Sequence, residues 1–321
     1  MREVANAPWD SATATEAAEN GHLHILEYLV EREYDQYDEN ACKYAAKNGH
    51  LDCLKYLHEV AKAPWDEDTA NAAAENGHLD ILEYLVEQSY DQYDDNACRS
   101  AALDGHLDCL KYLHEVAKAP WDSETASWAA EKGHLHILEY LVERKYDQYD
   151  EDACSCAAMN GHLDCLKYLH EVVKAPWDSG TAAMAAGRGH LHILEYLVER
   201  EYDAFDEACE YAAVGGHLAC LKYLHEVAKA PWDSWTASVA ALNGHLHILE
   251  YLVERKYDEY DENACRYAAE NGHLDCLKYL HEVAKAPWSY RAVEAAYEND
   301  HLECLQYLLE NNCPLPIGWR D

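Results

Sequence analysis

Basic residues are scarce in this sequence. It has 25 lysines and arginines against 61 aspartates and glutamates, which gives a formal net charge of -36. A polyanion repels the phosphate backbone of nucleic acids, so a nucleic-acid-binding protein needs at least a local stripe of basic side chains. The sequence contains no such stripe. We therefore expect no nucleic-acid partner, whereas a protein partner with a basic patch would suit the charge.

Long apolar runs and targeting signals are also missing. No stretch is apolar over the length that a bilayer requires, and the N-terminus lacks the apolar core of a signal peptide. We therefore expect no membrane partner and a cytoplasmic location. A targeting segment on a longer parent protein would not be visible in this sequence.

Sequence signatures of catalysis are absent as well. There is no glycine-rich phosphate loop and no unique Ser/His/Asp or Cys/His set. Each residue type that could act as nucleophile, base or metal ligand is copied many times along the chain, whereas catalysis needs a single pocket. We expect no enzymatic activity, no cofactor and no metal site.

The dominant feature that is present is a repeated pattern, Gly-His-Leu-x-x-Leu-x-Tyr-Leu. Its glycine recurs at a spacing of 28 residues, with one step of 27, and aspartate replaces it in the last copy. The copies begin at Gly21, Gly49, Gly77, Gly105, Gly133, Gly161, Gly189, Gly216, Gly244, Gly272 and Asp300. A fixed period of this length predicts an array of stacked structural repeats.

Each copy is expected to form two short helices. Asp38 or Asn40 can cap a first helix through Ala41–Ala46, because their side-chain oxygens accept hydrogen bonds from the free amides of the first turn. Gly49 ends this helix, since glycine adopts the left-handed conformation easily. A second helix follows over about residues 50–60, with leucines at helical spacing.

The core of the unit resembles the helix pair of ankyrin repeats. Residues 45–57 read A-A-K-N-G-H-L-D-C-L-K-Y-L, and variants of this pattern cover essentially the whole chain. Standard ankyrin units have about 33 residues and open with T-P-L-H, whereas these have 28 and open with P-W-D or Q-Y-D. The resemblance implies an all-α, ankyrin-like solenoid of stacked helix-turn-helix repeats, with short or absent β-hairpin fingers.

We expect one array over residues 1–321. It would contain a truncated leading repeat at 1–9, repeats at about 10–37, 38–65, 66–93, 94–121, 122–149, 150–177, 178–205, 206–232, 233–260, 261–288 and 289–316, and a short tail at 317–321. We expect a monomer. The leading repeat lacks the polar cap that a solenoid end usually needs, so end-to-end association there, as in an architectural spacer, is an alternative.

The cysteines occupy fixed repeat positions. Six of the thirteen lie four residues after the first residue of their copy, where Ile25 and Ile81 stand in other copies: Cys53, Cys109, Cys165, Cys220, Cys276 and Cys304. Exchange between isoleucine and cysteine indicates a small buried apolar site. We expect reduced core thiols rather than disulfides or metal ligands, which favours a reducing compartment.

A second period of 56 residues alternates charge. The position six residues after the repeat glycine carries glutamate and lysine in turn, from Glu27 and Lys55 to Glu250 and Lys278, before Gln306 in the last copy. Opposite charges on stacked neighbours are expected to pair and to help set the register.

Other repeated side chains are interpreted as structural. The tyrosines seven residues after the glycine, such as Tyr28, and the tryptophans of the P-W-D stretches, such as Trp65, are expected to pack between repeats. His22 and its equivalents are expected to bond across the turn between the two helices. A metal at His22-x-His24 is not expected, because residues two apart on a helix point in different directions.

Five acidic loops leave a rival function open. They contain Asp35, Asp91, Asp147, Asp203 and Asp258 and could form an array that binds calcium or other cations. Their spacing differs from that of an EF-hand loop, and the turn glycine is missing. Solvated loops that cap the following helices are the favoured interpretation.

The variable positions indicate where function can differ between repeats. The least constrained sites lie on the first helix, which lines the concave, partner-binding face in ankyrin proteins. The resemblance therefore implies a protein-binding scaffold or adaptor that uses this face. Large or basic side chains there are the candidate partner-binding residues: Lys43, Tyr44, Arg99, Trp128, Met184, Tyr211, Trp235, Arg266 and Tyr267.

The single 27-residue step falls just before Cys209. One residue is missing there, and Phe205 is the only phenylalanine in the chain. We expect the connection to absorb the deletion, either by a shorter cap turn or by a later helix start. The result would be a small change in stacking angle and a weak link in the array.

Overall fold

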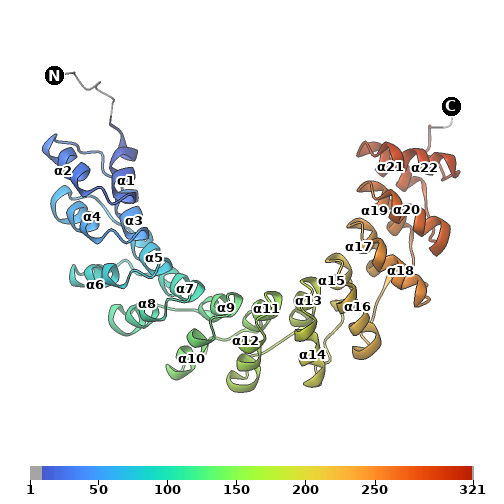
Figure 1. Cartoon of the computed structure of the whole chain (residues 1–321), viewed down its shortest axis with the longest axis horizontal. Coiled ribbons are helices and arrows are strands. Elements are labelled where there is room, and N and C mark those ends of the chain that lie inside the picture. The colour runs from blue at the N-terminus through green and yellow to red at the C-terminus, as the bar shows by residue number, and fades with distance from the viewer. Residues whose placement is uncertain (1–8, 320–321) are drawn as a thin grey trace. The chain divides into compact units, whose positions relative to one another are not determined.

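Paired helices make up the computed structural model, which describes residues 9–319 (Figure 1). Within this range every regular element is helical, and no strand occurs. The all-α prediction is confirmed, and the loops where ankyrins carry β-hairpin fingers contain no hairpin in the described part of the chain. Residues 1–8 of the expected leading repeat lie outside the described residues.

The first helix of each pair carries an odd number. These helices are α1 (Ser11–Glu19), α3 (Glu39–Lys47), α5 (Glu67–Glu75), α7 (Asp95–Leu103), α9 (Ser123–Glu131), α11 (Glu151–Met159), α13 (Ser179–Gly187), α15 (Ala208–Val214), α17 (Ser234–Leu242), α19 (Glu262–Glu270) and α21 (Tyr290–Glu298). The second helices are α2 (Leu23–Glu31), α4 (Leu51–Tyr56), α6 (Leu79–Glu87), α8 (Leu107–Tyr112), α10 (Leu135–Glu143), α12 (Leu163–Tyr168), α14 (Leu191–Glu199), α16 (Leu218–Tyr223), α18 (Leu246–Glu254), α20 (Leu274–Tyr279) and α22 (Leu302–Glu310).

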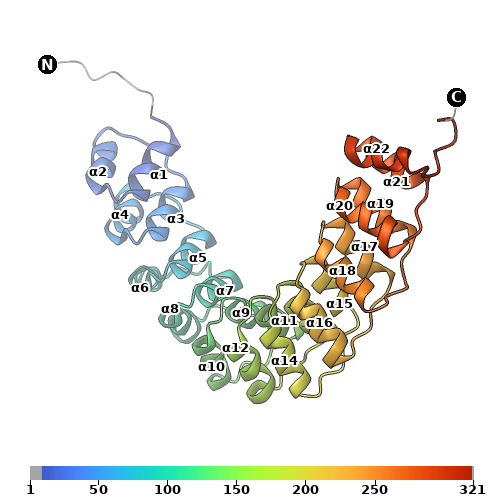
Figure 2. The same ribbon diagram turned by 45° about the vertical axis from the view of Figure 1, so that its right-hand side comes forward.

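Two compact units divide the chain. The first contains the described residues up to Ala153 together with Glu171–Val173, and the second contains Cys154–His170 and the described residues from Lys174 onward. In the first unit, α1, α3, α5, α7 and α9 pack in sequence, and in the second, α13, α15, α17, α19 and α21 do the same. Within each unit the first helices form one row and the second helices another (Figures 1 and 2).

The first helices approach one another closely because their contact surfaces are built from alanine. Ala45 and Ala46 of α3 are fully buried, and so are the equivalent alanines of most other first helices, such as Ala101 and Ala102 of α7. The cysteines four residues after the repeat glycine lie on the buried side of the second helices, as Cys53 of α4 and Cys109 of α8 show. Their burial raises the pKa of the Cys53 thiol to about 11 and that of Cys109 to about 12. The predicted core position is confirmed.

The repeat glycine has two reasons to be glycine. Gly49 has a φ of 73°, in the left-handed region, which confirms the predicted helix end. A Cβ atom there would also lie 2.6 Å from Cε1 of His78 in the next repeat. Asp300 adopts the same conformation with a φ of 57°.

The second helix exists in two forms, which the expected range of residues 50–60 does not anticipate. In α2 and its equivalents it is a regular α-helix, and Glu33, twelve positions after Gly21, is left-handed. In the other copies a π turn follows α4 or its equivalent, and the left-handed residue is Lys62, thirteen positions after Gly49. These π turns are Leu57–Ala61, Leu113–Ala117, Leu169–Val173, Leu224–Ala228 and Leu280–Ala284. The π turn accommodates one extra residue, and the following loop is one residue shorter.

The deletion before Cys209 is absorbed by a later helix start. Helix α15 has seven residues, whereas the other first helices have nine. Its N-cap residue, Glu207, already has helical backbone angles and makes no side-chain capping bond. Phe205 stays buried and packs its ring edge-on against Tyr202 at 5.0 Å between centroids. Of the two predicted adjustments, the later start is the one observed.

Candidate functional site

All nine predicted site residues lie on first helices, several positions before the repeat glycine. We call the exposed side of each row of first helices the first-helix face. The two units are described separately: α3, α7 and α9 carry the predicted residues of the first unit, and α13, α15, α17 and α19 carry those of the second.

A groove on the first-helix face of the first unit brings three predicted residues together. It has a volume of about 410 Å³ and is lined by Lys43 and Tyr44 of α3 and by Trp128 of α9. Ala72 of α5 and Ser100 of α7 occupy the position equivalent to Tyr44 and Trp128 in the intervening repeats. Two large rings therefore stand at the ends of the groove, and two small side chains form its floor.

Charged residues of both signs line this groove. Lys43 Nζ lies 2.6 Å from Oδ2 of Asp68, and this hydrogen bond raises the pKa of the Lys43 ammonium. Lys47 and Glu75 also line the groove. The ammonium of Lys43 keeps part of its surface open to solvent and can still contact a partner.

Arg99 is engaged within the chain. Its guanidinium forms ion pairs with Asp122, with Asp95 at 3.0 Å and with Glu124 at 3.0 Å. The hydrogen bond to Asp122 is the main reason that the pKa of Arg99 is raised. Asp122 is the N-cap residue of α9. With only 19% of its side chain exposed, Arg99 joins α7 to the start of α9 and positions that helix.

An aromatic cluster forms the corresponding feature of the second unit. Trp235 of α17 is 46% exposed and stacks on Tyr267 of α19, with ring centroids 6.0 Å apart and planes inclined by 24°. The guanidinium of Arg266 lies 5.2 Å from the centroid of the Tyr267 ring. Three residues that the sequence indicates singly thus form one surface, which we call the Trp235 cluster.

Met184 and Tyr211 are half-buried on α13 and α15. Gly187, near the end of α13, lies beneath the Tyr211 ring, since a Cβ atom there would be 3.3 Å from Cδ1 of Tyr211. A glycine at this position therefore lets the ring pack flat on the neighbouring helix.

The repeated tyrosines of five copies, such as Tyr84, pack between repeats, as predicted, whereas Tyr28 in the first described repeat is 46% exposed. Tyr84 is buried, and its hydroxyl donates to Glu59 Oε1 at 3.1 Å. The ammonium of Lys55 lies 5.4 Å from the Tyr84 ring centroid. The equivalent lysines also lie over tyrosine rings of the following repeat, as Lys111 does over Tyr140. The lysine column therefore contacts aromatic rings, and the predicted lysine–glutamate pairing is not the contact that forms.

The predicted bond of the histidine that follows the repeat glycine is wrong. His50 Nε2 donates to the carbonyl oxygen of Glu19, 31 residues earlier, and His78 donates to Lys47 in the same way, each at 3.1 Å. The last carbonyls of a helix have no partner within that helix. The histidine therefore caps the first helix of the preceding repeat rather than its own turn.

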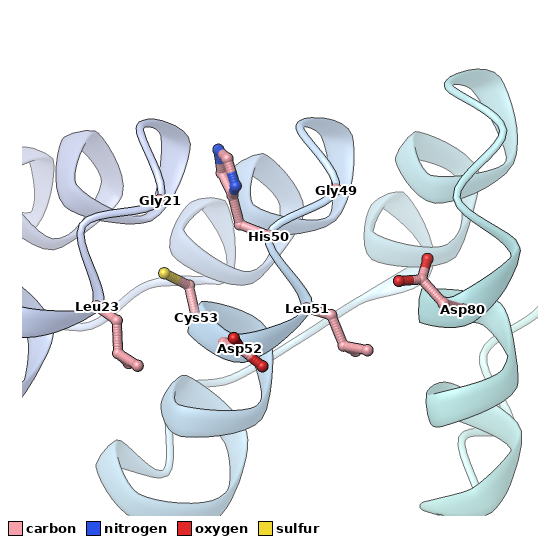
Figure 3. A pocket seen from close by; sticks show the side chains of 8 residues that line it. All are labelled: Gly21, Leu23, Gly49, His50, Leu51, Asp52, Cys53 and Asp80. Carbon is pink, nitrogen blue, oxygen red and sulfur yellow. The ribbon is translucent and has the colours of Figure 1, made fainter.

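Two equivalent pockets lie at the turns between first and second helices, and the repeat pattern alone did not predict them. One, of about 380 Å³, includes Gly21, Gly49, Asp52 and Asp80 in its wall (Figure 3). The other, of about 360 Å³, has the equivalent residues of the second unit, with Glu303 in place of Asp80. The third position after the glycine carries histidine or a carboxylate in every copy except the one with Ala219, and this variation was the available sequence signal.

Residues 9–319 contain neither a metal-binding cluster nor a membrane-spanning helix. No group of three or more histidine, cysteine, aspartate or glutamate residues in this range could hold a metal ion. The five acidic loops therefore bring no support to the cation-binding alternative. Among the described helices, none combines the length and the apolar character that a membrane span requires.

Comparisons with solved structures find only distant similarity. The maize pentatricopeptide repeat protein PPR10 in complex with an 18-nt psaJ RNA element has 11% identity and a TM-score of 0.46, over 96% of this chain and 57% of that one. A second structure, of the pentatricopeptide repeat protein PPR10 from maize, has 12% identity and a TM-score of 0.38, over 94% of this chain and 54% of that one. This chain thus spans little more than half the length of those proteins. No curated protein matches it.

Family profiles match most of the chain. The profile of ankyrin repeats in three copies matches residues 5–68, 99–175, 126–208, 156–233, 181–263, 209–287 and 237–316, and a second profile, ankyrin repeats in many copies, matches residues 71–114. Ankyrin repeats generally mediate protein–protein interaction, and the family is generally non-enzymatic. Helix pairs, repeat period and profiles agree, and the chain belongs to the ankyrin-repeat family.

Proposed function

We propose that this chain is a non-enzymatic scaffold that binds a protein partner through its first-helix face. The groove between Tyr44 and Trp128 is the observation that carries the proposal. Aromatic side chains beside a hollow are typical of binding hot spots, because a partner side chain that enters the hollow is surrounded and desolvated.

The chemistry of the groove defines the segment that it would accept. Ala72 and Ser100 leave space for one apolar side chain of the partner between the two rings. Asp68 and Glu75 at the groove wall, together with the net charge of -36, favour basic residues beside that apolar side chain. Complementary charge of this kind mainly raises the association rate and excludes acidic partners.

The second unit offers a separate contact surface in this proposal. The Trp235 cluster presents an exposed indole that is held in place by Tyr267, so little side-chain entropy is lost when a partner covers it. Met184 and Tyr211 extend the contact on α13 and α15. Arg99 has a positioning role, because its guanidinium is already occupied by three carboxylates.

The experiment that tests the proposal maps the footprint of a captured partner. The chain is used to capture proteins from the native cell, the partner is purified, and hydrogen exchange of the chain is compared with and without it. Protection on α3, α5, α7 and α9, or on α17 and α19, supports the proposal. Protection confined to the second helices and π turns would overturn it.

A further inference from the structure

The two turn pockets are equivalent at every position of their walls but one. Each is built from two residues of one repeat, five consecutive residues of the next, and one residue of a third. In the first pocket that last residue is Asp80, and in the second it is Glu303. Asp52 and Asp275 add a second carboxylate to each wall. In Figure 3, Leu51 lies between Asp52 and Asp80.

Three equivalent junctions elsewhere in the chain carry a histidine at the position of Asp80. His136 donates from Nε2 to the carbonyl oxygen of Gly105 at 3.1 Å. His192 does the same to Gly161 at 3.1 Å, and His247 to Gly216 at 2.9 Å. At these junctions the chain itself supplies a planar N–H donor to the carbonyl of the repeat glycine.

Asp80 and Glu303 cannot make this bond. A carboxylate only accepts hydrogen bonds, and Asp80 Oδ1 accepts instead from the amide of Ile81 at 3.0 Å. In the described part of the chain, Leu51 N is the one donor to the Gly49 carbonyl. Each pocket therefore combines a glycine carbonyl that can accept another N–H with two carboxylates that favour a cation.

We propose that these two pockets bind the guanidinium groups of arginine side chains from a partner protein. A guanidinium is planar, as the imidazole is, so it can direct one N–H at the glycine carbonyl as the histidines do. Its remaining N–H groups would face the Asp80 carboxylate, with Asp52 adding negative charge to the wall, and the fork geometry of arginine suits pairing with a carboxylate better than a lysine ammonium does. The site lies at the turns and is independent of the first-helix face.

The test uses N-acetyl-arginine amide as the probe and ligand-observed NMR as the readout. At probe concentrations far below saturation, the bound fraction is proportional to the number of sites. Asp80→His should fill the first pocket with the chain's own donor and reduce the specific bound fraction to about half. Adding Glu303→His should remove at least nine-tenths of it. Because histidine already stands at this position in three junctions, both variants should fold, which thermal melting would check.

A variant that creates a pocket complements the two variants that fill one. His136→Asp should create a third pocket at Gly105 and raise the specific bound fraction by about half. N-acetyl-citrulline amide, which has the same shape without charge, measures the non-specific part when used with wild type. Glu87→His changes charge equally at an exposed carboxylate outside the pockets and should leave binding unchanged.

Two results would overturn the proposal. One is equal probe binding by wild type and the Asp80→His, Glu303→His double variant. The other is an equal loss with Glu87→His, because binding would then follow overall charge. A lysine analogue that binds as tightly as the arginine probe would reject the guanidinium-specific form of the site.

Discussion

His50 donates a hydrogen bond from Nε2 to the carbonyl oxygen of Glu19, 31 residues earlier in the chain, at 3.1 Å. The same histidine ring lies against Gly21, where a Cβ atom would approach it to 2.8 Å. One side chain therefore caps a helix of the preceding repeat and requires glycine in the turn of that repeat. The same bond and the same close approach to a repeat glycine recur at His78, His134, His190, His245 and His273.

Replacing His50 with alanine should destabilise the chain by about 1 kcal/mol, the usual net contribution of one such hydrogen bond. Urea unfolding followed by circular dichroism measures this change. His22→Ala is the matched control, since that exposed histidine holds the equivalent position in the first described repeat and makes no such bond in the described residues. A loss no larger than that of the control would show that the cap contributes nothing to stacking.

Replacing Gly49 with alanine should be more costly, by about 2 kcal/mol or more. Alanine in the left-handed region costs about 1–2 kcal/mol, and its Cβ would press on the His78 ring at 2.6 Å. Gly318→Ala separates the two effects, because Gly318 has a φ of 95° with nothing within 4 Å of the added atom. Equal losses at the two positions would mean that the ring contact is unimportant.

The stabilising effect of His134 should depend on pH. Burial lowers the pKa of His134 below its ordinary value of 6.5, although its bond to Leu103 opposes this shift in part. The unfolded chain therefore takes up a proton at a higher pH than the folded chain, and stability contributed by the neutral ring is lost as pH falls from about 7 through 6.5 toward the folded pKa.

The comparison of wild type with His134→Gln isolates this effect, because glutamine offers an N–H to the same carbonyl without titrating. The difference in unfolding free energy should favour wild type most at pH 7 to 8 and should shrink as the pH falls to about 5.5. A difference that stays constant over this range would contradict a lowered pKa at His134.

The shortened repeat should exchange its amide protons faster than a regular one. Helix α15 begins late and has no side-chain cap on Glu207, and stability in repeat arrays sums over local units and their neighbours. Amides of residues 200–212 should therefore be less protected than those of residues 144–156, measured by hydrogen exchange with mass spectrometry. Equal protection would mean that the deletion does not weaken the array.

Features that depend on one repeat could be predicted from the sequence. Gly49 predicts a left-handed turn, and the exchange of isoleucine for cysteine at Cys53 predicts a buried site. Both predictions were confirmed. The first-helix position of Trp128 follows from the same local pattern. Local propensity and periodicity contain this information, because a left-handed turn, a buried helix position and the extent of a helix each follow from the pattern within one repeat.

Features that depend on the contact between repeats could not be predicted in the same way. The bond from His50 to Glu19 and the placement of Lys55 over Tyr84 both need the distance between stacked helices, which no single unit encodes. The π turn at Leu57–Ala61 also depends on where the next repeat begins. The hollow between Tyr44 and Trp128 appears only when four first helices are placed side by side.

The central claim is that the first-helix face binds the partner, and the affinity of a Tyr44→Ala, Trp128→Ala double variant tests it most directly. Isothermal titration of the purified partner should show a loss of about 2 kcal/mol or more, roughly a thirtyfold weaker complex, if these rings are hot spots. Val116→Ala, an exposed apolar residue of a π turn, should leave affinity unchanged. Unchanged affinity of the double variant, with its fold intact, would contradict the claim for this groove.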